Sequence, residues 1–501
     1  MTGMTATPDN DAGARRLCMI GLALATSVVC LDGTIIGTCG TVIARDIDGL
    51  SLYSWMVTAF LLFETAMIPI SGKMSDRFGR RPLMVIGLVL FLIGSVLAGM
   101  SQSMEMLIVC RCIQGIGGGI IVPVCTAAVA DLYPPEDRGK MQGILGASYG
   151  IGSGLGPLVG GFICSYISWR WVFYINVPLI AVCLVFTVGK LPMRSQLPTG
   201  RIDYIGMAVL TALLADILLF FEWVGNEFAV LSLQTLGMVV AAIVIGILFY
   251  HVEHRADDPI LAPKLFRNRT VVISMAIMLL YGLAMLGTLS FIAMYMIYVY
   301  DIDTMTCGFM LLPLVVGMMI TSMGSGMLVA KTGYRLWTVI GTVTIAASLL
   351  LMSTLGSDPS NLLLEIYLFA FGFGLGCVSS VVMAAVQNSS APSEVGMTTS
   401  SVSLVRSIGS TMGTAVFSLI IASRMDSGFA DTMFGGMADA FGLHGTGLLR
   451  FVDMGLSQAL SDVVVGLFAE GLCLAFLTIG LVFLVAVALA FLMDDEYAIE
   501  V

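Results

Sequence analysis

The chain has 501 residues, of which 58% are hydrophobic and only 11% are charged, and its formal net charge at pH 7 is −10. Soluble domains carry roughly a quarter charged residues, so this composition excludes a soluble protein whose polar surface covers an apolar core. We therefore expect the hydrophobic surface to face a lipid bilayer.

Apolar segments that are long enough to cross a bilayer recur along the whole chain. A transmembrane helix needs about 20 mostly apolar residues, and fourteen segments meet this requirement. The sequence therefore predicts an all-α integral membrane protein with fourteen transmembrane helices and both termini on one side. The segments are 17–43, 53–72, 83–100, 105–130, 142–166, 170–189, 203–223, 229–250, 271–298, 307–330, 337–355, 363–386, 403–422 and 463–492.

Lysine and arginine, which accumulate in cytoplasmic loops, indicate the orientation. With the N-terminus inside, seventeen of these cations lie in inner segments and four, Arg45, Arg170, Arg424 and Arg450, in outer ones. Both termini are therefore predicted to be cytoplasmic. The inner set is Arg15, Arg16, Lys73, Arg77, Arg80, Arg81, Arg138, Lys140, Lys190, Arg194, Arg201, Arg255, Lys264, Arg267, Arg269, Lys331 and Arg335.

The short loop between the second and third segments reads GKMSDRFGRRP, from Gly72 to Pro82. Gly72 allows two helices to approach closely, and Gly79 permits a tight turn. Asp76 can bond to the loop cations and face the N-terminus of a neighbouring helix. A loop that is merely positive on the inner side would explain the charges but not their order, so we interpret it as a conformational latch. Its arginines are Arg77, Arg80 and Arg81.

Several charged residues lie within predicted membrane segments, and four of them, Asp32, Glu64, Arg111 and Asp216, are candidates for a functional role. A charge at the membrane centre costs about 2.5–3.5 kcal/mol on insertion scales, so Arg111 in the fourth segment requires an acidic or polar partner. Asp32 in the first segment is a candidate partner. Glu64 in the second segment either faces a cavity or pairs locally with another helix, and Asp216 in the seventh is a further intramembrane acid.

The fifth segment carries a ridge of small residues, because Gly152, Gly156 and Gly160 recur every four positions beside Gly161. Such spacing lets two helix backbones pack closely in lipid. Pro157 adds a possible bend. The ridge serves simple helix packing, a gating movement, or both.

The latch resembles the signature loop of the major facilitator superfamily. The arginine, glutamine and glycine at Arg111, Gln114 and Gly115 resemble a pattern of its proton antiporters, and further matches indicate the fourteen-helix drug:proton antiporter branch. These matches are GIGSGLGPLVGG at Gly150 to Gly161, WRWVFYINVP at Trp169 to Pro178, and LDGTII at Leu31 to Ile36.

A degenerate copy of the latch, GMLVAKTGYR, occurs at Gly326 to Arg335, with Ala330 in the place of Asp76. The copy indicates a duplication of a six-helix half, as in other transporters with internal repeats. The predicted architecture is six plus two plus six helices. Its parts are a tail at 1–16, a bundle at 17–190, an inserted pair at 191–262, a bundle at 263–493 with an outer loop at 424–461, and a tail at 494–501.

The resemblance implies a multi-pass exporter of the cytoplasmic membrane that exchanges small lipophilic compounds such as drugs, cations among them, for protons, and thereby confers antibiotic resistance. Asp32 and Arg111, with Gln114, Glu64 and Asp216, are the expected proton and substrate residues. We expect no cofactor beyond the proton gradient, no nucleic-acid partner, no enzymatic activity and a monomer in contact with lipid. Two alternatives stay open: an exporter of a specific lipid, amino acid or metabolite, and a non-transporting sensor or scaffold.

Four further features of the sequence lead to predictions. The eleven cysteines include no CxxC pair and most fall in apolar runs, so we expect neither zinc sites nor disulfides. His251 and His254 are interpreted as interfacial anchors rather than metal ligands. Arg406, near the start of the thirteenth segment, is expected to meet lipid headgroups, with a contact to a gate as the alternative. The outer loop at 424–461 is expected to hold short amphipathic helices or to be unstructured.

Overall fold

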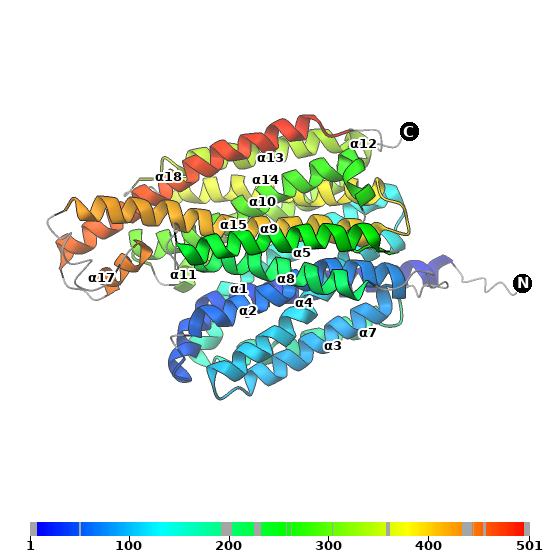
Figure 1. Ribbon diagram of the computed structural model, residues 1–501, viewed down its shortest axis with the longest axis horizontal. Helices are drawn as coiled ribbons and strands as arrows, with labels where there is room; N and C mark the ends of the chain where they lie inside the picture. The colour runs from blue at the N-terminus through cyan, green and yellow to red at the C-terminus, as the bar shows by residue number, and fades with distance from the viewer. Residues whose placement is uncertain are drawn as a thin grey trace, which may run out of the picture.

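A computed structural model describes residues 8–49, 52–191, 203–224, 232–256, 258–261, 263–302, 304–356, 361–432, 443, 445–453 and 457–494. The chain forms a bundle whose long helices run in roughly the same direction (Figure 1). α1 begins and α18 ends at the same end of this bundle.

The helices follow the predicted apolar segments closely. In the first half they are α1 (Pro8–Asp46), α2 (Tyr53–Phe78), α3 (Arg80–Gly99), α4 (Met104–Leu132), α5 (Pro135–Tyr166), α6 (Arg170–Tyr174) and α7 (Asn176–Thr187). Then come α8 (Tyr204–Trp223) and α9 (Leu233–Arg255). The second half has η2 (Pro263–Arg267), α10 (Arg269–Val299), α11 (Thr304–Met310), α12 (Leu312–Thr332), α13 (Tyr334–Met352), α14 (Asn361–Asn388), α15 (Val395–Ala430), η3 (Gly445–Leu449), α17 (Arg450–Asp453) and α18 (Gln458–Phe491).

Thirteen helical stretches among the described residues are long and apolar enough to cross a membrane. α5, with 32 residues, falls outside this set, and its sequence includes the glycine ridge at Gly152, Gly156 and Gly160. The prediction of an all-helical protein with many membrane-spanning helices is confirmed. The count of fourteen and the cytoplasmic side of the termini stay predictions.

Helix packing separates an N-terminal from a C-terminal half. Two apolar cores are built from residues before position 192, and the largest core is built from residues after position 270. Across the interface, α5 packs on α12 and α14, while α15 packs on α2 and α4. The pair α8 and α9 pack on each other, and α8 also contacts α2 and α15. The interface between the halves is therefore formed by α2, α4 and α5 of the first half and by α12, α14 and α15 of the second.

The loops rich in cations gather at the end of the bundle where α1 begins. The hydroxyl of Tyr133, just after α4, donates to the carbonyl of Arg15 at 3.3 Å. The guanidinium of Arg335 at the start of α13 donates to the carbonyl of Phe491 at the end of α18. This end carries the latch and its copy, and we refer to it as the latch end. The prediction that Gly72 to Pro82 form a loop is wrong, because α2 continues to Phe78 and α3 begins at Arg80, so that Gly79 alone separates the two helices.

At the opposite end, α15 is longer than predicted and continues to Ala430, inside the predicted outer loop. The described part of that loop forms the short helices η3 and α17. They pack onto the end of α15, because Asp426 Oδ1 accepts a hydrogen bond from the backbone N–H of Gly445 and the ring of Phe429 stacks on that of Phe451. The described residues of the loop therefore follow the helical alternative.

Candidate functional site

A cavity of about 140 Å³ lies between the two halves of the chain. Its wall comes from α1, α2, α4 and α5 on one side and from α10 and α15 on the other. A smaller space of about 60 Å³ adjoins it and shares the side chains of Val122, Tyr149, Ser403 and Arg406. Among the described residues that line these two spaces, the charged ones are Glu64 and Arg406. We call the two spaces together the central cavity.

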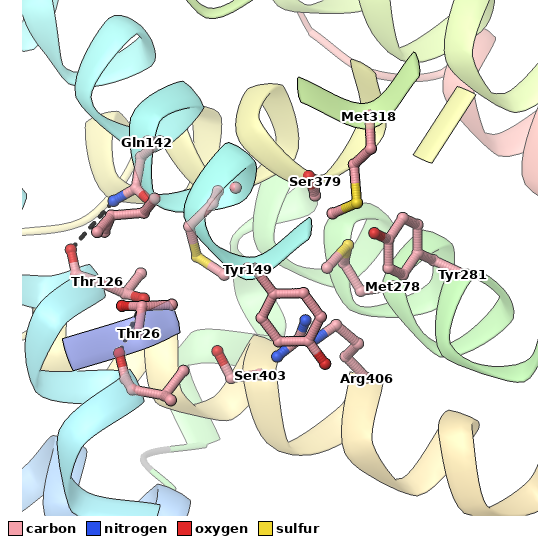
Figure 2. A pocket seen from close by; sticks show the side chains of 14 residues that line it. Thr26, Thr126, Gln142, Tyr149, Met278, Tyr281, Met318, Ser379, Ser403 and Arg406 are labelled. Atoms are coloured by element: carbon pink, nitrogen blue, oxygen red, sulfur yellow. Dashed lines mark hydrogen bonds between the residues drawn. The ribbon is translucent and has the colours of Figure 1, made fainter. Parts of the chain in front are cut away.

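Arg406 lies inside the bundle and not at its surface. Its guanidinium carbon is 5.0 Å from the centre of the Tyr149 ring, and Figure 2 shows the two side chains next to each other in the cavity wall. The expectation that Arg406 meets lipid headgroups is wrong. The reason is that α15 begins at Val395, so Arg406 lies about three helical turns into the helix.

Glu64 on α2 lines the larger part of the central cavity, which is one of the two positions that the sequence left open for it. Methionines contribute much of the apolar lining, and their flexible thioether side chains suit ligands of varied shape. The methionines that line the central cavity are Met278, Met285, Met318 and Met383.

Asp32 and Arg111 form a fully buried ion pair between α1 and α4. Gln114 accepts a hydrogen bond from Arg111 Nη1 at 2.9 Å and donates to Asp32 Oδ1 at 3.1 Å. Asn176 at the start of α7 donates to the same Asp32 oxygen at 2.8 Å, and Ser95 on α3 accepts from Gln114 at 2.7 Å. The structure thus brings Asp32, Arg111 and Gln114 together, in a network that does not line the central cavity.

The latch carboxylate connects the two halves of the chain. Asp76 accepts hydrogen bonds from the backbone N–H groups of Gly396 at 2.9 Å and Met397 at 2.7 Å, both in the first turn of α15. These N–H groups lack partners within the helix, and the positive end of the helix dipole favours an anion. Arg80 pairs with Asp76 at 2.7 Å and with Asp131 of α4 at 2.8 Å.

The two glycines of the latch have separate structural reasons. A Cβ atom on Gly72 would lie 2.0 Å from Ser400 Oγ and 2.5 Å from the carbonyl oxygen of Gly396, so only glycine lets α2 and α15 approach this closely. Gly79 has a φ of 92°, a conformation that side chains disfavour, and it separates α2 from α3.

The remaining latch cations lie nearer the surface. Lys73 and Arg77 both pair with Asp258, which follows the inserted helices α8 and α9. The latch is therefore tied to the inserted pair as well as to α15. Arg81 is half-buried in the first turn of α3.

The glycine ridge of α5 packs against α1. A Cβ on Gly152 would lie 2.4 Å from the carbonyl oxygen of Ser27, and one on Gly156 would lie 2.0 Å from Thr34 Oγ1. Gly160 is equally close to α1, whereas the space around Gly161 is open. Pro157 lies inside α5. The ridge thus joins two helices of the same half.

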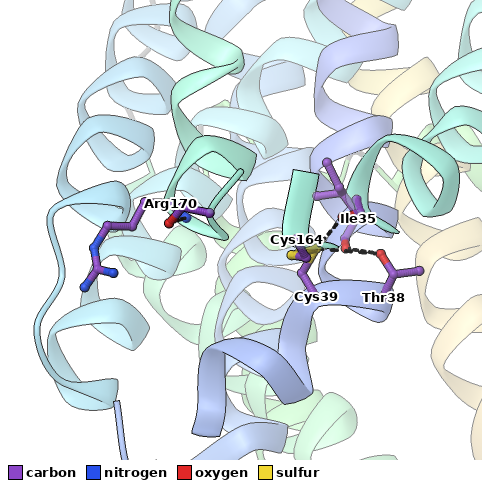
Figure 3. The surroundings of a disulfide bond; sticks show 7 residues. Ile35, Thr38, Cys39, Cys164 and Arg170 are labelled. Carbon is purple, nitrogen blue, oxygen red and sulfur yellow. Dashed lines mark hydrogen bonds between the residues drawn. A yellow bond between two sulfur atoms is a disulfide. The ribbon is translucent and has the colours of Figure 1, made fainter. Parts of the chain in front are cut away.

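A disulfide between Cys39 and Cys164 joins α1 to α5 near the end opposite the latch (Figure 3). The expectation that the chain has no disulfide is therefore wrong, because the two cysteines are 125 positions apart and only the fold brings them together. At the same end, the Nε1 atom of Trp169 donates to Asp46 Oδ2 at 2.7 Å. This hydrogen bond, aided by Arg170, holds the pKa of Asp46 below its ordinary value.

Asp216 on α8 is separate from the other predicted charges. It does not line the central cavity, and its enclosed Oδ2 has no hydrogen-bond partner in the part of the chain that the structure describes. The structure does not bring Asp216 together with Asp32, Glu64 or Arg111.

The sequence model of the Major Facilitator Superfamily matches residues 22–414, which is more than half of the chain. The chain belongs to the major facilitator superfamily. The multidrug transporter protein MdtP of Bacillus subtilis (strain 168) is 34% identical over 463 residues, covering 91% of this chain and 86% of that protein. Multidrug resistance protein 3 of the same strain is 33% identical, covering 85% of this chain and 83% of that protein.

Solved structures show the same fold at low sequence identity. The proton:xylose symporter XylE, a superfamily member bound to 6-bromo-6-deoxy-D-glucose, aligns with a TM-score of 0.63 over 97% of this chain and 98% of that chain. The sequence identity is 14%, so this likeness shows the fold alone. Members of the superfamily are transporters and not enzymes, as the sequence predicted.

The positions or contacts of three interior residues were not predicted from the sequence. Arg406 was placed at the wrong depth. Asn176 lies within the motif at Trp169 to Pro178, so its position was marked but its contact with Asp32 was not foreseen. Tyr281 on α10 lines the central cavity, and no sequence pattern distinguishes it from other aromatic residues of that helix.

Proposed function

We propose that this protein exports small lipophilic compounds, such as drugs, from the cell in exchange for protons by alternating access. Two kinds of support favour export: relatives at 33–34% identity carry the names multidrug transporter and multidrug resistance protein, and a central cavity lies at the interface of the two halves. We further propose fourteen transmembrane helices, cytoplasmic termini, a location in the cell membrane, a monomer and no cofactor.

Closure of the latch end supports alternating access. Arg138 at the start of α5 donates to Asn388 Oδ1 at the end of α14 at 2.9 Å, and Gln387 donates to the carbonyl oxygen of Thr126 on α4 at 2.7 Å. With the contacts of Asp76 to α15, these bonds join the halves at one end. Opening the cavity to the cytoplasm requires breaking them, and two rigid halves rocking about a central site would do so.

The size of the central cavity fits a contracted stage of such a cycle. Ligand pockets for drug-sized molecules occupy about 300–1,000 Å³, whereas the larger part of the cavity holds about 140 Å³. Its walls belong to both halves, so separation of the halves enlarges it. Binding of a drug-sized compound and opening of the latch end are therefore coupled in this proposal.

The proposal that protons are exchanged rests on the position of Glu64 in the wall of the central cavity. A carboxylate there can meet water, substrate and proton in turn as access changes sides. Asp32 is instead fully buried, paired with Arg111 and bonded to two amides. We therefore assign proton exchange to Glu64 and assign to the Asp32 network the positioning of α1 and α4.

The test is proton-gradient-driven uptake of lipophilic cations and neutral dyes into inverted membrane vesicles. The variants are Glu64→Gln, Asp32→Asn and, as a matched control, Glu105→Gln at the exposed start of α4. We expect the intact protein and the control to accumulate the compounds. Glu64→Gln should abolish gradient-driven movement while leaving the amount of folded protein unchanged.

The other outcomes decide between the alternatives. If Glu64→Gln transports normally and Asp32→Asn does not, the buried pair carries the proton and our assignment is wrong. If the intact protein moves none of the compounds, export of drugs is excluded, and a narrow substrate or a sensor function takes its place.

A further inference from the structure

Arg406 is an interior cation that forms no ion pair with an acid among the residues that the structure describes. In the described part of the chain, no hydrogen bond or ion pair engages its guanidinium, whose recorded contact is the face of the Tyr149 ring at 5.0 Å. A guanidinium carries five N–H donors, and an intramembrane charge is costly without partners. The donors of Arg406 are therefore available to a ligand that enters the central cavity.

Glu64 supplies a second charge, of opposite sign, in the same cavity. Its carboxylate accepts no hydrogen bond from the described residues, and no ion pair joins it to Arg406, although both side chains face the larger part of the cavity. The two groups are close enough to influence each other electrostatically. A ligand between them would meet an acceptor on one side and donors on the other.

Neutral polar groups surround Arg406. Along α15, one face directs Ser403, Ser407 and Ser410 into the cavity wall beside it. Across the smaller space, the enclosed hydroxyl of Tyr281 lacks a well-formed hydrogen bond and lies near the Ser379 side chain (Figure 2). An unsatisfied buried hydroxyl is costly. A ligand oxygen bound to Arg406 could satisfy such groups at the same time.

The remaining wall is apolar. Phe60 and Leu61 of α2 face Met285, Leu286 and Leu289 of α10 across the larger part of the cavity. An occupant therefore needs an apolar body in addition to its charged groups. Flexible methionine and leucine side chains accept apolar bodies of varied outline.

We infer that the central cavity takes zwitterionic amphiphiles, in which an apolar body carries one protonated amine and one carboxylate. The inference rests on the proposed export function and names its substrate class. The amine lies against Glu64, and the carboxylate accepts hydrogen bonds from Arg406, with the planar fork of the guanidinium matching two carboxylate oxygens.

The negative charge of Glu64 is consistent with exchange of the ligand for a proton. The amine of the ligand and the proton compete for the carboxylate of Glu64, so one leaves as the other arrives. A ligand with only a negative charge would bind best when Glu64 is protonated, and it would then travel with the proton. A ligand with only a positive charge would leave Arg406 unpaired.

Three fluorescent probes with the same apolar part and different charges distinguish a zwitterionic ligand from a cationic or an anionic one. Nε-dansyl-lysine is the zwitterion, its methyl ester is the cation, and its Nα-acetyl derivative is the anion. Their dissociation constants are measured by fluorescence titration with the full chain in lipid nanodiscs. The variants are Arg406→Gln, Arg406→Lys, Glu64→Gln and Arg424→Gln, the last being a control at an exposed arginine that pairs with Glu470.

We expect the intact protein and Arg424→Gln to bind the zwitterion at least tenfold more tightly than either derivative. Arg406→Gln should weaken the zwitterion about tenfold and should not weaken the ester, because removal of a neighbouring cation cannot disfavour a cationic ligand. Glu64→Gln should weaken the zwitterion and the ester but not the acetyl derivative. Arg406→Lys keeps the charge and should retain most of the preference, so it tests the inference even if Arg406→Gln does not fold.

Two results would overturn the inference. The first is equal affinity of the intact protein for zwitterion and ester, or no binding of the zwitterion at all. The second is an equal loss of all three probes in Arg406→Gln, which would mark a structural role. Proton-driven uptake of the ester into inverted vesicles, measured alongside, shows whether the export function stands when the zwitterion preference fails.

Discussion

The loop between α2 and α3 and the loop between α12 and α13 have the same shape but different chemistry. Gly79 and Gly333, at equivalent positions, have φ and ψ of 92° and 161° and of 84° and 163°. Gly72 crosses the backbone of α15 at Gly396, and Gly326 crosses that of α5 at Gly139. The first loop is nevertheless held by charges, while the second has an alanine in place of the acid.

The partner helices explain this difference. Gly396 is the second residue of α15, so its N–H has no partner within the helix and bonds to Asp76 instead. Gly139 is the fifth residue of α5, where an N–H already bonds to the carbonyl four residues earlier. An acid at position 330 would find no free N–H groups there, so Ala330 suffices.

The second loop uses a neutral hydrogen bond where the first uses an ion pair. Arg80 pairs with Asp131 near the end of α4, and Tyr334, at the equivalent position, accepts a hydrogen bond from Asn388 at the end of α14 at 2.7 Å. The two copies therefore share the turn and the close helix crossing. The acid occurs only in the first copy, where the N–H groups at the start of α15 are free to bond to it. Both joints thus have a close crossing at glycine, and the first adds the ion pairs of Asp76 and Arg80.

The largest effect is expected from Asp76→Ala. It leaves the buried Arg80 with Asp131 as its acidic partner and two N–H groups of α15 unsatisfied, and removal of one partner of a buried ion pair costs about 3 kcal/mol or more. We expect loss of transport and a lower unfolding temperature, measured by vesicle uptake and by thermal unfolding in detergent. Lys331→Ala, at the exposed position next to Ala330 in the second copy, is the control and should change neither.

Substitution of the crossing glycines should have the next largest effect. Gly72→Ala and Gly326→Ala each force two helices apart, at about 1–3 kcal/mol for overpacking. At Gly72 the shortest contact is to the Ser400 side chain, at 2.0 Å from its Oγ, so adding Ser400→Gly should restore part of the lost stability. At Gly326 the obstacle is the carbonyl oxygen of Gly139, at 2.3 Å, and no side-chain change can remove it.

Thermal unfolding of the single and double variants measures this rescue. A Gly72→Ala, Ser400→Gly protein no more stable than Gly72→Ala would contradict the steric account of the first crossing. Equal rescue of Gly326→Ala by a side-chain deletion on α5 would contradict the account of the second.

The smallest effect is expected from Tyr334→Phe, which removes one hydrogen bond to Asn388 and no charge. A neutral hydrogen bond contributes about 1 kcal/mol, so the variant should fold, transport and unfold at a slightly lower temperature. The matching change in the first loop, Arg80→Met, should be several times more costly. Similar losses in the two loops would show that the difference between ion pair and hydrogen bond is unimportant here.

Much of the latch and of the buried network could be predicted from the sequence. Spacing alone placed Asp76 next to the loop arginines and a neighbouring helix N-terminus. The cost of an intramembrane charge predicted that Arg111 needs a partner, and the resemblance to the superfamily favoured Asp32. These predictions succeed because a buried charge has few ways to be satisfied. The roles of Asp32, Glu64 and Asp216 in coupling stay predictions.

Other features depend on where helices begin and on which faces meet. Arg406 was misplaced because α15 starts at Val395, within a polar stretch of serine and threonine that hydropathy does not recognise as helix. Contacts between distant positions, such as Asn176 with Asp32, arise from the packing of the bundle and leave no local pattern in the sequence.

The disulfide between Cys39 and Cys164 bears on which side of the membrane each end of the bundle faces. Disulfides persist in oxidising compartments and are rare where thiols are kept reduced. The bond lies at the end opposite the latch, and the count of lysines and arginines predicts that this end faces the outside, where a disulfide would persist. Both cysteines belong to one half, so oxidation fastens α1 to α5 without crossing the interface between the halves.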